Sequence, residues 1–124
     1  MRTPDRRHRR ATNTTQALRY QLAACVEDGA LGAMVVADGD GLPLASSGDA
    51  YACEEVAARL VLVGARIREF DGRLLGAGAC WDVKMTKVDV DGTELLVCAV
   101  GGEPEARRRQ IARGVAGAVR ILAA

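Results

Sequence analysis

The sequence predicts an α/β domain in which helices cover both faces of a β-sheet. Two observations support this fold class. The expected elements follow the order helix, two strands, helix, two or three strands, helix. The strands expected at 32–37 and 93–100 are almost entirely apolar. An apolar run without alternation indicates a strand buried on both faces. Helices are therefore expected on both sides of the sheet.

The length limits the chain to one such domain. Its 124 residues, 49% of them hydrophobic and 27% charged, can form a core without disulfides or metal. No run is long and apolar enough to cross a membrane, and no secretory signal is visible. We therefore expect a cytoplasmic protein with reduced thiols, which makes all four cysteines core residues. They are Cys25, Cys53, Cys80 and Cys98.

Positive charge is concentrated at the N-terminus. Of 17 basic and 16 acidic residues, five arginines and one aspartate fall in residues 1–10, which leaves 12 basic and 15 acidic residues elsewhere. We expect residues 1–12 to be a disordered basic tail and residues 13–124 to form the domain. The single histidine, His8, lies in this tail, which excludes histidine-dependent hydrolases. A slightly acidic body with 3% aromatic residues does not suggest a nucleic-acid partner.

The first element is expected to be a helix over 13–28. Leu18, Leu22 and Cys25 fall on one face of that helix, together with Val26. Asn13 and Gln16 fit a capping box at its start. Gly29 is the expected stop signal.

A β-hairpin is expected next. The turn residues Asp38 to Gly41 separate an apolar strand at 32–37 from a second strand at 42–46. The spacing of the acidic residues does not match a calcium-binding loop, so the turn interpretation is preferred. Pro43 cannot donate a ladder hydrogen bond, which places the second strand at a sheet edge.

The longest helix is expected over 50–70, and it is apolar on two opposite sides. One side, directed at the core, comprises Val56, Leu60, Val63, Ile67 and Phe70. The opposite side comprises Ala58, Val61, Leu62 and Ala65. A helix that is apolar on two sides is buried on two sides. Because one small domain has few elements to cover both, these four residues are expected to form a dimer interface.

The remainder is expected to be strands followed by a final helix. Trp81, Val83 and Met85 alternate in one phase, whereas Val88 and Val90 alternate in the other. A shift of this kind marks a bulge or a break into two strands near Thr86. Asp91-Gly92 then forms a hairpin turn, and Thr93 to Val100 forms a central strand.

The final helix starts at Pro104, which is a favourable first-turn residue. Its core face comprises Ile111, Val115, Ala118 and Leu122. Its opposite face carries Arg109, Arg113 and Arg120, which are candidates for binding a partner.

Motifs for catalysis are missing from the sequence. There is no phosphate-binding loop of the G-x-x-x-x-G-K type, no H-E-x-x-H and no nucleophile elbow. Trp81 is either a core or rim residue or an anchor of an interface. We therefore expect no enzyme activity, no cofactor, no metal site and no catalytic residues.

The segment Gly32 to Gly48, flanked by a helix on each side, resembles the Roadblock family. The most specific part is Asp38-Gly39-Asp40-Gly41-Leu42-Pro43-Leu44-Ala45-Ser46. The resemblance covers about residues 14–122. It implies a three-layer sandwich, in which an antiparallel sheet of about five strands has a central helix on one face and both terminal helices on the other. It also implies a dimer formed through the central helices and edge strands.

The family includes bacterial partners of Ras-like GTPases. The resemblance therefore implies a non-enzymatic homodimeric regulator or scaffold that binds a Ras-like small GTPase and acts on its GTP hydrolysis indirectly. Two alternatives stay open at this point. One is a structural or assembly subunit without a GTPase partner, and the other is a sensor of a small ligand. A deep apolar pocket would favour the sensor.

Overall fold

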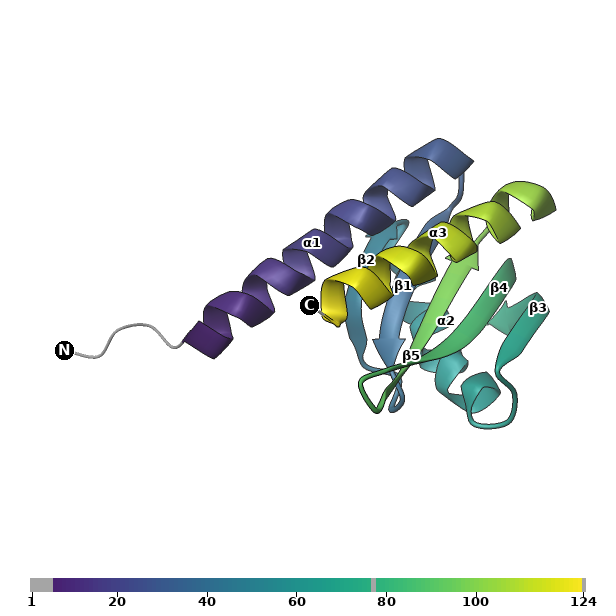
Figure 1. The fold of residues 1–124 in the computed structure, drawn as a ribbon. Coiled ribbons are helices and arrows are strands. Elements are labelled where there is room, and N and C mark those ends of the chain that lie inside the picture. The colour runs from purple at the N-terminus through teal and green to yellow at the C-terminus, as the bar shows by residue number, and fades with distance from the viewer. Residues whose placement is uncertain (1–5, 77, 124) are drawn as a thin grey trace.

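A five-stranded antiparallel sheet forms the middle layer of the structure, a computed structural model that describes residues 6–76 and 78–123 (Figure 1). Its strands are β1 (Ala33–Asp38), β2 (Pro43–Gly48), β3 (Glu69–Gly76), β4 (Ala79–Val90) and β5 (Thr93–Val100), in the order β2-β1-β5-β4-β3. The helices are α1 (Arg6–Gly29), α2 (Ala50–Gly64) and α3 (Pro104–Leu122). One apolar cluster joins α2 to the sheet, and a second joins α1 and α3 to its other face. The predicted three-layer α/β fold is confirmed.

The two central strands are β1 and β5, as their apolar runs predict. Val35 and Cys98, which are opposite one another in the ladder, contribute to the cluster under α2. Their neighbours Met34, Val36 and Val97 contribute to the cluster under α1 and α3. All five side chains are 0% exposed. Both faces of these strands are therefore covered by helices.

The strand that starts at Pro43 is an edge strand, as predicted. The hairpin turn before it is stabilised by Asp38, whose carboxylate Oδ1 accepts hydrogen bonds from the backbone N–H groups of Asp40 and Leu42, each at 2.9 Å. Gly41 completes the turn with a φ of +87°. Turn formation thus accounts for this acidic, glycine-rich segment.

The start of α1 differs from the prediction. The helix begins at Arg6 and not at Asn13, so residues 6–12, expected to be disordered, belong to it. The rest of the predicted tail, residues 1–5, lies outside the described part of the chain. Leu18, Leu22 and Cys25 are buried on the inner face of α1, as predicted.

The end of α2 also differs, because the helix stops at Gly64 instead of residue 70. Ile67 lies after the helix and is 43% exposed, and Phe70 belongs to β3. The side chain of Lys87, from β4, caps this end of the helix: its Nζ donates a 2.8 Å hydrogen bond to the Gly64 carbonyl. An amine at this position satisfies a carbonyl that has no partner within the helix.

The phase change in β4 is neither a bulge nor a break. The pairing with β5 runs in continuous register from Val83–Val100 to Val90–Thr93. Instead, the two halves of the strand are covered on opposite faces. Val83 and Met85 point into the cluster under α2, whereas Val88 packs against the cluster under α1 and α3. The chain breaks into two strands earlier than expected, between the end of β3 and the start of β4.

The final helix begins at Pro104 as predicted, and Ile111 and Ala118 are buried on its inner face. Val115 and Leu122 are partly buried against the same cluster. Among the cysteines, Cys25, Cys53 and Cys98 are buried, but Cys80 is exposed at the start of β4. The expectation of four core cysteines is therefore wrong for Cys80. Within the described residues, the helices are too short or too polar to span a membrane.

Candidate interaction surfaces

The four residues predicted for a dimer interface lie on the side of α2 that faces away from the sheet, with Ala65 as the C-cap directly after the helix. Val56 and Leu60, on the inner side, are 0% exposed. On the outer side Leu62 is 71% exposed, Ala58 and Ala65 are exposed, and Val61 is partly buried. Together these residues form an apolar strip that is largely exposed in the described part of the chain. We call them the α2 outer face.

The tip of the β1–β2 hairpin packs against this face. A Cβ atom built on Gly41 would lie 3.0 Å from the Cβ of Val61, so the hairpin tip lies against the second half of α2. The next residue, Leu42, is 64% exposed. Sequence reasoning missed Leu42, because the contact between the hairpin and the helix is a tertiary one.

An arginine and two aromatic rings connect α2 to β3 and β4. Arg59 donates from Nε to the Leu75 carbonyl at 2.8 Å and pairs with the Glu55 carboxylate one turn away. Its guanidinium lies 5.6 Å from the ring centre of Trp81, and the Tyr51 ring lies 6.0 Å from Trp81 on centroids. We call Tyr51, Arg59 and Trp81 the aromatic cluster.

Trp81 is partly buried in the aromatic cluster, which is consistent with either of its predicted roles. Sequence reasoning missed Arg59. The spacing of Glu55 and Arg59 by four residues in a helix was the available signal. Tyr51, beside Trp81, is 52% exposed.

The three candidate arginines of α3 do not act alike. Arg109 and Arg120 are exposed. Arg113 instead forms an ion pair with Asp28 of α1 at 2.6 Å and donates to the Gln110 side chain at 3.3 Å. The Asp28 contact raises the pKa of Arg113 above its ordinary value. Arg113 therefore contributes a contact between the two helices of one layer, and all three arginines stay candidates for partner binding.

A fourth arginine on α3 is structural. Arg107 is 7% exposed, and its Nη1 donates to the carbonyls of Gly101 and Gly102 at 2.8 Å each. Both glycines have positive φ values, in the turn between β5 and α3. Arg107 thus fixes that turn.

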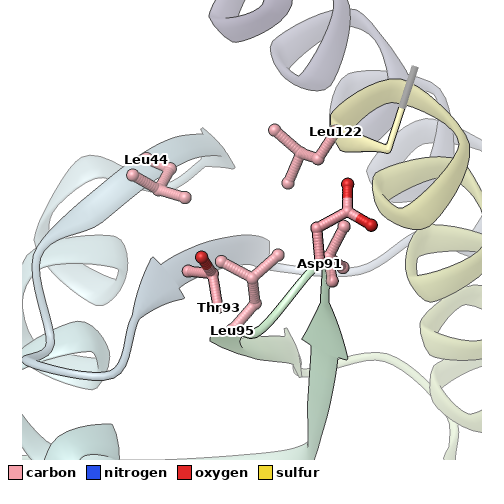
Figure 2. Close-up of a pocket in the computed structure, with 6 residues that line it drawn as sticks. Leu44, Asp91, Thr93, Leu95 and Leu122 are labelled. Atoms are coloured by element: carbon pink, nitrogen blue, oxygen red, sulfur yellow. The ribbon is translucent and has the colours of Figure 1, made fainter.

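An apolar cavity of about 230 Å³ lies between β2, the β4–β5 turn and the end of α3 (Figure 2). Its walls are Leu44, Val90, Asp91, Thr93, Leu95 and Leu122. Ligand pockets usually measure about 300–1,000 Å³, so this space is small for a metabolite. This particular space is therefore not the deep apolar pocket that would favour a sensor. Across residues 6–76 and 78–123, no group of three or more His, Cys, Asp or Glu side chains is arranged to hold a metal.

Comparisons with known proteins identify the fold. No protein-family profile matches the chain. No curated protein matches it in sequence. Solved structures do match over 87% of the chain. MglB from Myxococcus xanthus has a TM-score of 0.59 at 10% identity, with 89% of its own length covered. The gliding protein MglB from Thermus thermophilus has a TM-score of 0.59 at 15% identity and 90% coverage.

A structure described as MglB with a tetrameric arrangement has a TM-score of 0.60 at 15% identity, with 89% of that chain covered. At such identities the likeness concerns the fold. The resemblance to the Roadblock family, which includes Mgl-type proteins, is therefore confirmed at the level of architecture.

Proposed function

We propose that this chain is a homodimeric regulator or scaffold that binds a Ras-like small GTPase and does no catalysis of its own. The observation that carries the proposal is the α2 outer face, which is exposed and apolar in a fold shared with MglB. The resemblance of residues 32–48 to the Roadblock family supports the GTPase as partner. Arg109 and Arg120 provide positive charge for the acidic switch surface of such a GTPase.

The energetics favour a second copy on the α2 outer face. Complete burial of a Leu or Val side chain is worth about 1.5–3 kcal/mol. In a two-fold symmetric dimer each residue is buried twice, once in each copy. Leu62 and Val61, with small residues at Ala58 and Ala65 that allow close approach of the helices, would together offset much of the cost of association.

The dimer is tested by charge substitutions on this face. We expect the double variant Leu62→Glu with Ala65→Glu to be a folded monomer by light scattering and circular dichroism, while the wild type is a dimer. Tyr20→Glu is the matched control, because Tyr20 is 68% exposed on α1, in the other helical layer. The control should remain dimeric. A wild type that is monomeric at micromolar concentration contradicts the proposed dimer.

The GTPase is tested with the same three proteins as bait. Wild type and Tyr20→Glu should retain a GTP-binding protein from the native cell, in an amount that depends on added GTP analogue or GDP. The purified pair should then be assayed for hydrolysis. If the dimer forms but retains no nucleotide-binding protein in either state, the chain is an assembly subunit and the GTPase proposal is wrong.

A further inference from the structure

Tyr51, in the first turn of α2, is in line with the exposed residues of the α2 outer face. Its side chain is 52% exposed. Tyr51, Ala58 and Ala65 follow one another at intervals of seven residues, which is close to two turns of a helix, so they lie on one side of α2. Leu62 falls between the last two on the same side and is 71% exposed. The exposed apolar stripe therefore runs along all of α2, from Tyr51 to Ala65.

This stripe lies on the flank of α2 that is next to β4. The Tyr51 ring is 6.0 Å from the ring of Trp81, a β4 residue, between centroids. On the other flank, Val61 is partly buried and is the residue that Gly41 of the hairpin tip approaches. Val61 thus has a neighbour within its own chain, whereas Tyr51 and Leu62 are each more than half exposed. The free part of the α2 outer face is therefore the part in line with Tyr51.

Tyr51 has the properties of an interface anchor. Trp81, on which its ring packs, is itself packed against the cluster under α2 and lies 5.6 Å from the Arg59 guanidinium. A ring that is already in place loses little conformational freedom when a partner covers it, and tyrosine is enriched at the positions that dominate binding energy. The small side chains of Ala58 and Ala65 leave room for a large one from another helix.

Charges near the two ends of α2 favour one orientation of a second copy. Glu54, in the first turn, and Arg66, just after the helix, are both exposed. If two α2 helices cross antiparallel at Ala58, Glu54 of each copy lies about one turn along the axis from Arg66 of the other. A parallel pairing would instead place Glu54 beside Glu54 and Arg66 beside Arg66, and like charges in an interface are unfavourable. Charge complementarity therefore selects the antiparallel arrangement.

We propose that Tyr51 is an anchor of the dimer: in antiparallel α2 helices that cross at Ala58, its ring packs on Ala65 and Leu62 of the second copy. Tyr51 precedes Ala58 by seven residues and Ala65 follows it by seven, so the two positions meet across the two-fold axis. The contact forms twice, once from each copy. This inference rests on the proposed homodimer and adds to it a residue outside the predicted four.

Tyr51→Ala tests the anchor. We expect it to raise the dissociation constant of the dimer about ten-fold or more in analytical ultracentrifugation, with an unchanged circular dichroism spectrum. Tyr51→Phe should keep the affinity of the wild type, because the ring and not the hydroxyl packs on the second copy. Tyr20→Ala is the matched control, since Tyr20 is 68% exposed on α1, and it should dimerise normally.

A double-mutant cycle tests the contact between copies. Tyr51→Ala and Leu62→Ala each remove one side of the same contact, so the double variant should lose less affinity than the product of the two single losses. If the two losses multiply, Tyr51 and Leu62 act independently and the proposed packing is wrong.

Cross-linking tests the orientation, in a Cys80→Ser background that removes the exposed thiol. With a short bis-maleimide, Ala58→Cys should give covalent dimers, because the two copies of this residue meet at the crossing point. Ala65→Cys should not, since its two copies lie about 21 Å apart along the helix axes. Equal cross-linking of the two variants contradicts the antiparallel crossing.

The outcomes separate this inference from the proposed dimer. A wild type that is monomeric overturns both. A wild-type dimer that Tyr51→Ala weakens no more than Tyr20→Ala does overturns the role of Tyr51 alone and leaves the dimer through the α2 outer face standing.

Discussion

Ala30 shows how a single backbone position shapes the connection between α1 and β1. It has a φ of +50°, in the left-handed region, while the Leu31 N–H donates to the Val26 carbonyl at 3.0 Å to close the helix. Ala30, not Gly29, is therefore the left-handed residue that ends α1. Gly29 has a different function: a Cβ there would lie 2.5 Å from Cγ of Gln110, so glycine allows α3 to approach.

Ala30→Gly should stabilise the protein. A left-handed alanine costs about 1–2 kcal/mol, which exceeds the entropy that glycine adds to the unfolded chain. We expect a gain of about 0.5–1 kcal/mol in the free energy of unfolding, measured in urea. Ala116→Gly is the matched control, since Ala116 is also exposed but lies inside α3. The control variant should lose about 1 kcal/mol of its free energy of unfolding. Destabilisation by Ala30→Gly would contradict the strain argument.

The cysteines differ in accessibility, which makes them reporters of the fold. Cys25 and Cys98 are 0% exposed, Cys53 is 6% exposed and Cys80 is exposed. Since the thiolate is the reactive form, a bulky thiol reagent should modify Cys80 rapidly in native protein and the other three only on unfolding. Peptide mapping of the labelled sites measures this. Rapid native labelling of Cys25 or Cys98 would contradict their burial.

Burial also links Cys98 to the pH dependence of stability. Desolvation raises the pKa of the Cys98 thiol far above its ordinary value, and it raises those of Cys25 and Cys53 in the same direction. The unfolded chain therefore loses these protons first as the pH rises. Stability should be constant with respect to these thiols below about pH 8 and should fall above about pH 9.

Urea unfolding at pH 7, 8, 9 and 10 measures this effect. Cys98→Ala should be less stable at pH 7, because it leaves a cavity. Between pH 9 and pH 10, the free energy of unfolding of Cys98→Ala should nevertheless fall by less than that of the wild type. An identical decline in both proteins would exclude Cys98 as a contributor.

At the level of elements, Lys87 caps the carbonyl end of α2. Its side chain is only 16% exposed and lies between the Gly64 carbonyl, at 2.8 Å, and the Glu94 carboxylate, at 3.0 Å. The amine thus connects the end of α2 to two strands. It also fills the α2 side of β4 just beyond Met85, which is why no apolar residue follows there.

Lys87→Met should cost about 1–2 kcal/mol of stability, because the Gly64 carbonyl loses a charged donor in a partly buried site. Lys84→Met is the matched control. Lys84 is 18% exposed, but its nearest acidic oxygen, on Asp71, is 4.0 Å away. The control should change stability by less than about 0.5 kcal/mol. Thermal or urea unfolding compares the two, and equal losses would mean that the Gly64 contact contributes little.

At the level of the whole molecule, α1 and α3 form one layer. Among its candidate arginines, Arg113 makes an ion pair between the two helices, whereas Arg109 and Arg120 are exposed. Arg113 is paired with Asp28. A variant that replaces all three candidate arginines would therefore change both the stability of the fold and the affinity for the partner, and the two effects could not be separated. Arg109→Gln with Arg120→Gln removes only the two candidate charges that are not paired with Asp28. It should leave the melting temperature nearly unchanged and weaken association with the GTPase, mainly at low salt.

Arg113→Gln is the comparison for this prediction. It should lower the melting temperature and leave the salt dependence of association unchanged. The measurement is GTPase affinity at two salt concentrations. Equal affinities and equal salt dependence for wild type and Arg109→Gln/Arg120→Gln would show that these arginines are only solvated.

The sequence by itself determined the features that depend on local patterns. Apolar runs identified β1 and β5 as central strands, Pro43 identified β2 as an edge strand, and the spacing along α2 separated its inner side from its outer side. Each of these follows from side-chain periodicity or from the covalent structure of proline, which act within a few residues.

Tertiary structure alone decided the features that depend on distant partners. Lys87 caps the Gly64 carbonyl of α2, Asp28 engages Arg113, and the two halves of β4 are covered on opposite faces. The contact of the hairpin tip with α2 at Val61 and the aromatic cluster around Trp81 belong to the same class. Periodicity shows that a face is apolar or that a charge is available. Only the packing of elements far apart in the sequence determines which neighbour covers that face or pairs with that charge.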